Sequence, residues 1–145
     1  MRSTYVGVVS KARAIPEVRK YMSTSPNTIG ADQTMAHAHE VMRKQKIRHL
    51  PVLTGSRLVG LLSDGDLHLV ETLRDVDPEK VRVEEAMTDI VYSVAPTTPI
   101  DEVVKEMARH KYGSAVVVDN GHVVGMFTTV DACQAFAEML HTRLT

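Results

Sequence analysis

The fold of this chain is decided by the stretch "LVGLLSDGD" (Leu58–Asp66) and by a second stretch, "VVGMFTTVD" (Val123–Asp131). Each is an apolar run with a glycine near its centre, which is typical of a buried strand. Each then ends in small and polar residues, with a hydroxyl side chain three positions before an aspartate. The repetition of this ending predicts two equivalent units, each with the same kind of site behind its strand.

The sequence repeats at a constant offset of 65 residues, without a gap. Internal similarity at a fixed period is the sign of a repeated structural unit. Identities are few, but the class of residue repeats, as in "HLPVL" against "SAVVV". The identical pairs include Met22 with Met87, Met42 with Met107, Val52 with Val117, Gly60 with Gly125, and Asp66 with Asp131.

Within each unit, periodicity predicts the order strand, helix, strand, strand, helix, and therefore an α/β fold. Extended runs open the units at residues 26–30 and 91–95, and Thr98 before Pro99 is expected to cap the helix that follows the second run. Apolar residues at helical spacing predict that the first helix of each unit turns one face inward. These inner residues are Met35, Ala38 and Met42 in the first unit and Ile100, Val103, Val104 and Met107 in the second.

The second half of each unit is predicted to be a hairpin followed by a helix. Asn120-Gly121 is a strong signal for a tight turn, and Thr54-Gly55 stands in the matching place. The closing helix of the second unit is expected to carry one apolar stripe, formed by Ala132, Ala135, Phe136, Met139 and Leu140.

The domain boundaries follow from the repeat and from a polar stretch at residues 74–82, which we interpret as a linker. We expect an N-terminal arm at residues 1–14, a first domain at 15–77 and a second at 78–145. A unit of about 60 residues is marginal alone, because it buries only about 60 % of its unfolded surface. The two units should therefore pack together through their sheets, with pseudo-two-fold symmetry.

Composition excludes several classes of protein. The 145 residues are 43 % hydrophobic, which suffices for a core, and 17 basic against 18 acidic side chains include no basic run suited to nucleic acid. No stretch approaches the roughly 18 apolar residues of a membrane span, and the N-terminus lacks a long apolar region, so we expect a cytoplasmic protein. The single Cys133 excludes an internal disulfide, and its helical position predicts packing as a small apolar group.

Together these motifs resemble a known family, the tandem cystathionine-β-synthase (CBS) domain pair, also called a Bateman module. The resemblance covers about residues 16–140 and rests on "VRKYMS", "VEEAMT", "IRHLPVL" and the two endings quoted above. It implies a regulatory module, without catalysis, whose effector is an adenosyl ligand: AMP, ADP, ATP or S-adenosylmethionine. It also implies a homodimer that acts on an unknown protein. A structural or partner-docking module with empty sites is the alternative.

The residues at the two endings fit an adenosyl ligand. Ser63 and Thr128 come directly before a predicted helix, where free N–H groups and a partial positive charge favour an anion. The aspartate three residues on, Asp66 or Asp131, can accept both hydroxyls of a ribose, and Gly65 leaves room for the sugar. The alternative is a capping box, which needs no ligand and contributes about 1 kcal/mol to helix stability.

The resemblance places the adenine between the first extended run and the second strand of each unit. Most residues there are apolar, so plain core packing is the alternative, and both roles can hold together. The positions are Thr28, Ile29, Leu50 and Pro51 in the first unit and Ser93, Val94, Ala115 and Val116 in the second.

Arg48 and His49 stand directly before the second strand of the first unit, where the resemblance implies contacts to the phosphates of a nucleotide. A solvated strand entrance is the alternative. The second unit has Gly113 and Ser114 at the matching positions, and Ser114 is kept as a candidate ligand contact. We therefore expect unequal sites, of which the first prefers the phosphorylated ligand.

Neither a metal site nor a catalytic residue is predicted. His37 and His39 lie two residues apart on a helix and face different directions, which disfavours a shared metal. In "GLLSDG", Leu61 occupies the position where a nucleophile elbow needs glycine, and the common glycine-rich phosphate loops are absent. An enzyme stays a rival interpretation that turnover of ATP would reveal.

Overall fold

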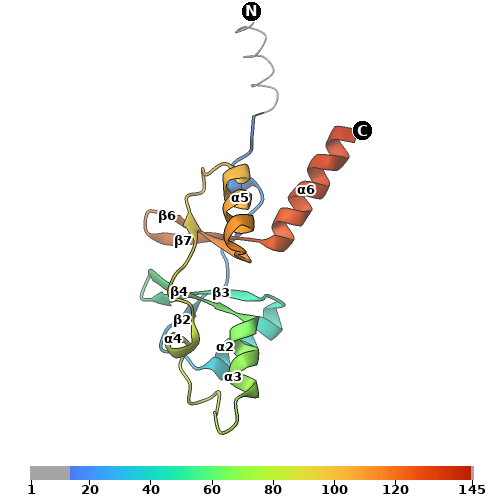
Figure 1. The fold of residues 1–145 in the computed structure, drawn as a ribbon. Coiled ribbons are helices and arrows are strands. Elements are labelled where there is room, and N and C mark those ends of the chain that lie inside the picture. The colour runs from blue at the N-terminus through green and yellow to red at the C-terminus, as the bar shows by residue number, and fades with distance from the viewer. Residues whose placement is uncertain (1–13, 145) are drawn as a thin grey trace, which may run out of the picture.

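The computed structural model describes residues 14–144, so the predicted N-terminal arm lies outside the described residues except for Ala14. Figure 1 shows two layers of strands stacked face to face, with the helices on their outer sides. The first unit comprises β2 (Ile29–Gly30), α2 (Met35–Gln45), β3 (His49–Thr54), β4 (Arg57–Ser63) and α3 (Asp64–Thr72). The second comprises β5 (Ser93–Val94), α5 (Ile100–His110), β6 (Ser114–Asp119), β7 (His122–Thr128) and α6 (Thr129–Leu144). The predicted order of elements and the α/β fold class are confirmed.

Each unit builds its sheet in the same way. β2 runs parallel to β3, with Ile29 beside Val52, and β3 forms an antiparallel hairpin with β4. In the second unit β5 runs parallel to β6, with Ser93 beside Val116, and β6 forms a hairpin with β7. A parallel pair needs a crossover connection, which α2 and α5 supply.

The segment ahead of each unit packs against the other unit. The 3₁₀ helix η1 (Val18–Lys20) and β1 (Ser23–Thr24) precede the first unit, yet β1 pairs with β7 and Val18 is buried in the second core. In the same way α4 (Val83–Ala86) precedes the second unit, yet Val83 is buried in the first core. The two units are therefore interleaved.

This exchange explains why methionine and glycine repeat in the sequence. Met22 packs over Gly125 of β7, and Met87 packs over Gly60 of β4. A Cβ atom on either glycine would collide with the methionine Sδ and would approach a backbone carbonyl oxygen to 3.0 Å. Each pair thus closes one unit with a residue from the segment that precedes the other.

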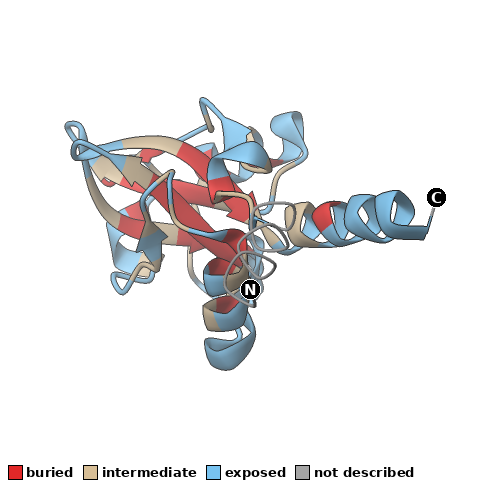
Figure 2. Ribbon diagram, turned by 90° about the horizontal axis from the view of Figure 1, so that it is seen from above, coloured by how far each residue is buried: buried red, intermediate tan, exposed pale blue. Residues whose placement is uncertain are grey.

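Each sheet covers a hydrophobic core on its helix side, and Figure 2 shows how burial concentrates on the strands and the facing helices. The expected inner residues of α2 and α5 are buried, except that Val104 is half-buried. The first core contains Ile29, Ala31, Met35, Ala38, Met42, Leu50, Val52, Leu62, Leu67, Val70 and Val83. The second contains Val18, Ile100, Val103, Met107, Ala115, Val117, Phe127 and Ala135.

The hairpin turn of the first unit lies one residue later than the sequence predicted, whereas the turn of the second unit lies where it was predicted. Asn120-Gly121 forms the second turn as predicted, with φ values of 52° and 79°. In the first unit, however, β3 continues through Thr54, so the turn residues are Gly55 and Ser56 rather than Thr54-Gly55. Gly55 has a φ of 62°, which glycine adopts without strain.

Two other local predictions are wrong. Thr98 does not cap α5, because Pro99 takes the N-cap position with an extended backbone and forms no side-chain cap. Cys133 is exposed rather than packed, because α6 extends away from the rest of the second unit (Figure 1). The same geometry exposes most of the predicted α6 stripe, of which Ala135 alone is fully buried.

Over residues 14–144, no helix combines the length and apolar character that crossing a bilayer requires. Nor do the described residues contain a group of three or more His, Cys, Asp or Glu side chains placed to hold a metal ion. His39, which the sequence singled out, instead contacts Glu71 across the α2–α3 pair.

Candidate ligand site

The candidate site is built at the end of each hairpin where the closing helix begins. His49 pairs directly with Ser63 across the first hairpin, and Ser114 pairs with Thr128 across the second. Side chains of directly paired residues share one face of a sheet, and successive residues alternate between faces. Since the next residues, Leu50 and Ala115, lie in the helix-side cores, all four side chains face the opposite sheet.

His49 shows that the two units meet at this place. A Cβ atom built on Gly113 would lie 3.0 Å from Nε2 of His49, so the imidazole of the first unit packs against the backbone of the second. Gly113 leaves the space that the ring fills. The predicted phosphate residues of one unit thus adjoin the strand entrance of the other, which the sequence did not indicate.

Both hydroxyl and aspartate pairs form complete capping boxes. Oγ of Ser63 accepts from the backbone N of Asp66 at 3.3 Å, and Oδ2 of Asp66 accepts from the backbone N and Oγ of Ser63 at 2.8 and 3.0 Å. At α6, Thr128 and Asp131 repeat the arrangement with distances of 3.4, 2.9 and 3.2 Å. The capping boxes that the sequence allowed as an alternative to ligand binding are therefore present, and each uses Oδ2 of its aspartate.

The predicted adenine residues gather at the same end of each sheet. Ile29, Leu50, Pro51, Ala115 and Val116 are buried. Thr28 and Ser93 are exposed, and Val94 is half-buried. Ile29, Leu50 and Ala115 also belong to the helix-side cores, so core packing accounts for their burial.

Val116 differs from those core residues. It is fully buried and pairs with Met126, which is 5 % exposed, yet neither side chain belongs to a helix-side core. Both therefore lie on the inner face, where the two sheets meet. Two hollows adjoin other parts of the first unit: one of about 390 Å³ lies beside Thr28 and the hairpin turn at Gly55, and one of about 570 Å³ lies between α2 and α3 beside Gly65.

The charged residues at the strand entrance differ in how they are held. Arg48 has an 80 % exposed side chain, and its Nε lies 3.9 Å from Oδ2 of Asp64, which is a loose ion pair. His49 is half-buried, and burial lowers its pKa below the usual 6.5; Asp64 opposes this effect and Arg48 adds to it. Burial therefore favours the neutral form of the imidazole.

Sequence reasoning missed how the strand entrance is joined to the helix start. The backbone N of Asp64 donates to the carbonyl of Arg48 at 2.9 Å, and in the second unit Thr129 donates to the carbonyl of Gly113 through its backbone N and its Oγ1, both at 3.1 Å. Asp64 and Thr129 are equivalent at the repeat offset, so comparison of the repeats was the available signal. Arg109 and His110, also near the second strand entrance in sequence, lie at the end of α5, where both contact Glu106.

Ser114 is the exception among the polar groups of the site. Its side chain is 3 % exposed, and its Oγ is the one buried side-chain N or O atom in residues 14–144 without a hydrogen-bond partner. A buried polar group without a partner costs about 1–3 kcal/mol. Ser114 was predicted as a ligand contact, but its missing partner is visible only in the structure.

The lowered pKa of His49 predicts a pH dependence of stability. The unfolded chain takes up a proton at His49 near pH 6.5, whereas the folded chain does so only at lower pH, so the free energy of unfolding should fall as pH decreases below 6.5. Denaturant unfolding between pH 8 and pH 5 measures this. In His49→Gln, which cannot titrate, the decrease should be smaller, and an unchanged decrease would show that other groups cause it.

Comparison with known proteins decides the family. A family model for the CBS domain matches residues 18–70 and 83–138. This chain belongs to the CBS domain family. The two matched segments make it a CBS pair, as the sequence motifs predicted.

Relatives of this CBS pair include proteins of similar length. Hypoxic response protein 1 of Mycobacterium tuberculosis is 26 % identical over 121 residues, which cover 83 % of this chain and 85 % of that protein. CBS domain-containing protein YhcV of Bacillus subtilis is 27 % identical, over 79 % of this chain and 81 % of that protein. An inosine-5'-monophosphate dehydrogenase of Korarchaeum cryptofilum is also 27 % identical, but the matched region covers only 25 % of that enzyme's length.

Solved structures of CBS pairs share the fold. The CBS domain pair of protein MJ0100, in complex with 5'-methylthioadenosine and S-adenosyl-L-methionine, matches with a TM-score of 0.78 and 27 % identity, over 86 % of this chain and 98 % of that one. CBSX2, in complex with AMP, has the same fold, with a TM-score of 0.77, 21 % identity and coverage of 85 % and 97 %.

Proposed function

We propose that this CBS pair is a regulatory module that binds an adenosyl ligand where its two units meet and that catalyses no reaction. The bound adenosyl ligands of the MJ0100 pair, which shares the fold at 27 % identity, support this ligand class. The residues proposed for each moiety lie at one end of each sheet, on elements whose positions are fixed by the cores.

The observation that carries the proposal is the buried hydroxyl of Ser114. It faces the opposite sheet beside Thr128, at the start of α6, and it has no partner. A polar atom of a ligand in this place would gain a hydrogen bond and remove the cost of the unpaired group. A purely structural module without a ligand would leave this hydroxyl unpaired.

The capping boxes are compatible with ribose binding. Both aspartates use Oδ2 for the cap, so Oδ1 of Asp66 and of Asp131, with its two lone pairs, is available to the two ribose hydroxyls. The cap also fixes the rotamer of each carboxylate before a ligand arrives, which lowers the entropy cost of binding. We therefore assign each aspartate two roles, one in the helix and one in the site.

The adenine is assigned to the inner face, against Pro51 in the first unit and Val116 in the second. Both side chains are buried, and neither belongs to a helix-side core. The phosphates of a nucleotide are assigned to Arg48, whose exposed guanidinium is held only loosely by Asp64. A guanidinium binds phosphate in a bidentate manner and keeps its charge at any working pH. Gly113 offers no such group, so the sites are unequal.

A structural or docking module is the second candidate. It is favoured by the capping boxes, which are complete without a ligand, and by the membership of Ile29, Leu50 and Ala115 in the cores. The two candidates differ in whether stability responds to small molecules.

The melting temperature with and without ligand separates these candidates. A ligand that binds only the folded protein adds about 2.7 kcal/mol of stability at one hundred times its dissociation constant. We expect at least one of AMP, ADP, ATP and S-adenosylmethionine to raise the melting temperature at millimolar concentration. A melting temperature that is indifferent to all four would favour the docking module.

We also propose that the protein works as a homodimer, since two-fold pairing is the commonest assembly. Large apolar side chains that are exposed on α6, among them Leu140, support this assembly.

A further inference from the structure

The last helix of the second unit packs differently from its counterpart in the first. α3 lies along α2 and buries Leu67 and Val70 in the first core. At the repeat offset, α6 has the smaller residues Ala132 and Ala135, of which only Ala135 is fully buried. Figure 1 shows α6 diverging from α5. The second unit is therefore open on this side.

The opening is a groove of about 800 Å³ between α6, the start of α5 and the first described residues of the chain. Its lining is mostly apolar, and several large side chains in it are uncovered. Phe136 is 63 % exposed, Ile15 is 53 % exposed and Met139 is 38 % exposed. Contiguous exposed apolar surface marks a place where another segment or molecule binds.

The N-terminal segment, residues 1–13, joins the described chain at the edge of this groove. Ile15 and Pro16 line the groove themselves. The backbone N of Ile100 donates to the carbonyl of Pro16 at 2.9 Å, which holds the chain against the start of α5. The fold therefore fixes the attachment point of the N-terminal segment at the groove.

The sequence of the N-terminal segment, "MRSTYVGVVSKAR", suits an apolar groove with acidic groups on its rim. Residues 5–9, "YVGVV", are apolar apart from one glycine. The segment contains no acidic residue, and its basic residues are Arg2, Lys11 and Arg13. It thus carries an apolar middle between positively charged ends.

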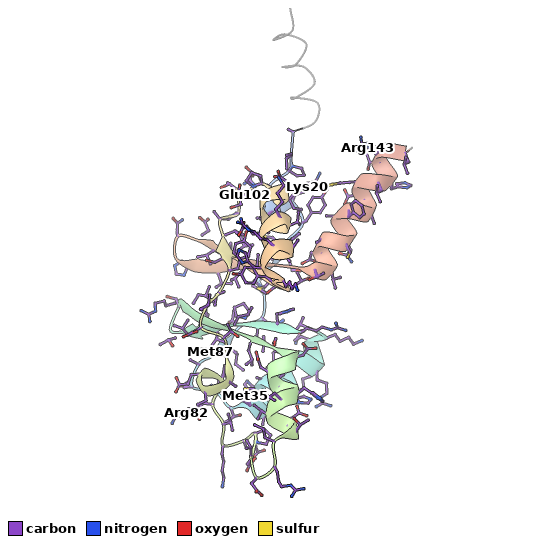
Figure 3. All side chains as sticks on the ribbon, in the orientation of Figure 1. Lys20, Met35, Arg82, Met87, Glu102 and Arg143 are labelled. Carbon is purple, nitrogen blue, oxygen red and sulfur yellow. The ribbon has the colours of Figure 1, made fainter. Side chains whose placement is uncertain are left out.

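The rim of the groove offers carboxylates to these basic residues. Asp101 and Glu138 lie on it, and neither forms an ion pair with another of residues 14–144. Of the two bases on the rim, Lys20 places its ammonium 5.4 Å from the centre of the Tyr21 ring. In Figure 3, Lys20 lies on the side of the groove nearer α5, and Arg143 lies near the outer end of α6. Opposite charges across an interface favour the matching partner.

The covalent connection favours the N-terminal segment over a free partner. An extended chain of 13 residues spans at most about 43–47 Å, whereas the 16 residues of α6 extend over about 24 Å. The segment can therefore reach the whole groove. A short linker holds a segment at an effective concentration of roughly millimolar, which is about a hundredfold above a second copy at tens of micromolar.

We propose that the chain's own N-terminal segment occupies this groove, with residues 5–9 packed against Phe136 and Met139. The inference concerns a surface outside the ligand site and does not rest on the proposed function. Leu140 and Leu144 do not line the groove, and they lie four residues apart on another face of α6. That face stays open to the proposed homodimer.

Tryptophan fluorescence tests the inference, because the chain contains no tryptophan and one placed in the segment reports on it alone. In Tyr5→Trp the emission should be blue-shifted, as for a buried indole. Adding Phe136→Asp, which places a charge on the groove wall, should move the emission to that of an exposed indole. Adding Leu69→Asp is the matched control, since Leu69 is 61 % exposed on α3 and outside the groove, and it should change nothing.

Trypsin, which cleaves after lysine and arginine, gives an independent measurement in the chain without the tryptophan. Cleavage after Lys11 and Arg13 should be about tenfold or more faster in Phe136→Asp than in the wild type, because the segment loses an apolar contact and is cleaved only when undocked. Glu138→Lys should act in the same direction, and more weakly at high salt. This exposed position keeps the test valid if circular dichroism shows that Phe136→Asp is misfolded.

Sedimentation of the same samples separates docking within one chain from covering by a second copy. Docking within the chain predicts emission and cleavage that do not change with protein concentration. Emission of an exposed indole in Tyr5→Trp, or equal cleavage in the wild type and in folded groove variants, would overturn the inference. A blue shift that grows with the dimer fraction would assign the groove to a second copy and also overturn it. A monomer with a docked segment would support the inference and overturn only the homodimer.

Discussion

Replacing Asp131 with alanine is expected to weaken adenosyl binding at the second site about 100-fold or more. A carboxylate that accepts two ribose hydroxyls contributes about 1.5–3 kcal/mol for each bond, and both bonds disappear together. Asp66→Ala should do the same at the first site, so calorimetry of either variant should show one tight site fewer than the wild type. The fold should remain, because each aspartate is half-buried at a helix start and outside both cores.

The matched control for this prediction is Thr34→Ala. Thr34 caps α2 by accepting from the backbone N of His37 at 3.1 Å, and it has no place in the proposed site. Loss of either cap should cost about 1 kcal/mol of stability, so the two variants should melt alike. If Asp131→Ala and Thr34→Ala also bound ligand alike, the aspartate would be a cap and nothing more.

Arg48→Ala is expected to weaken AMP binding about ten- to a hundredfold, which corresponds to about 1.5–3 kcal/mol for a charge-assisted contact. Adenosine, which lacks the phosphate, should bind the variant and the wild type equally. The loose pair with Asp64 does not compete strongly, because an exposed ion pair contributes only about 0–1 kcal/mol.

Arg57→Ala provides the control for Arg48. Arg57 is exposed at the turn end of β4, far along the hairpin from the proposed phosphate contact, and its removal changes the net charge by the same amount. AMP affinity should be unchanged in this variant. Equal losses for AMP and adenosine in Arg48→Ala, or equal losses in both arginine variants, would contradict the phosphate assignment.

The parts of the fold that the sequence predicted well are those set by local pattern. The inner faces of α2 and α5 follow from apolar residues at helical spacing, and Asn120-Gly121 specifies a turn that needs two positive φ values. The repeat offset then carried these local assignments from one unit to the other. The offset also identified Ser63 and Asp66 as equivalent to Thr128 and Asp131. The two pairs have the same capping geometry in the structure.

The features that the sequence could not predict depend on contacts between distant segments. Nothing local indicates that Val18 joins the second core while Val83 joins the first, or that His49 packs against Gly113. The apolar stripe of α6 suggested a core helix, because periodicity reveals an apolar face but not what covers it. For the same reason the missing partner of Ser114 emerges only when its neighbours are in place.

The central claim is that the place where the two units meet binds an adenosyl ligand. Isothermal titration calorimetry of AMP and of S-adenosylmethionine into the wild-type protein, with Ser114→Ala titrated in parallel, tests it most directly. We predict saturable binding of at least one ligand to the wild type and, in Ser114→Ala, weaker binding at the second site, where the hydroxyl is absent. No binding heat for either ligand at millimolar concentration, or binding at the second site that is identical in Ser114→Ala, would contradict the proposed site.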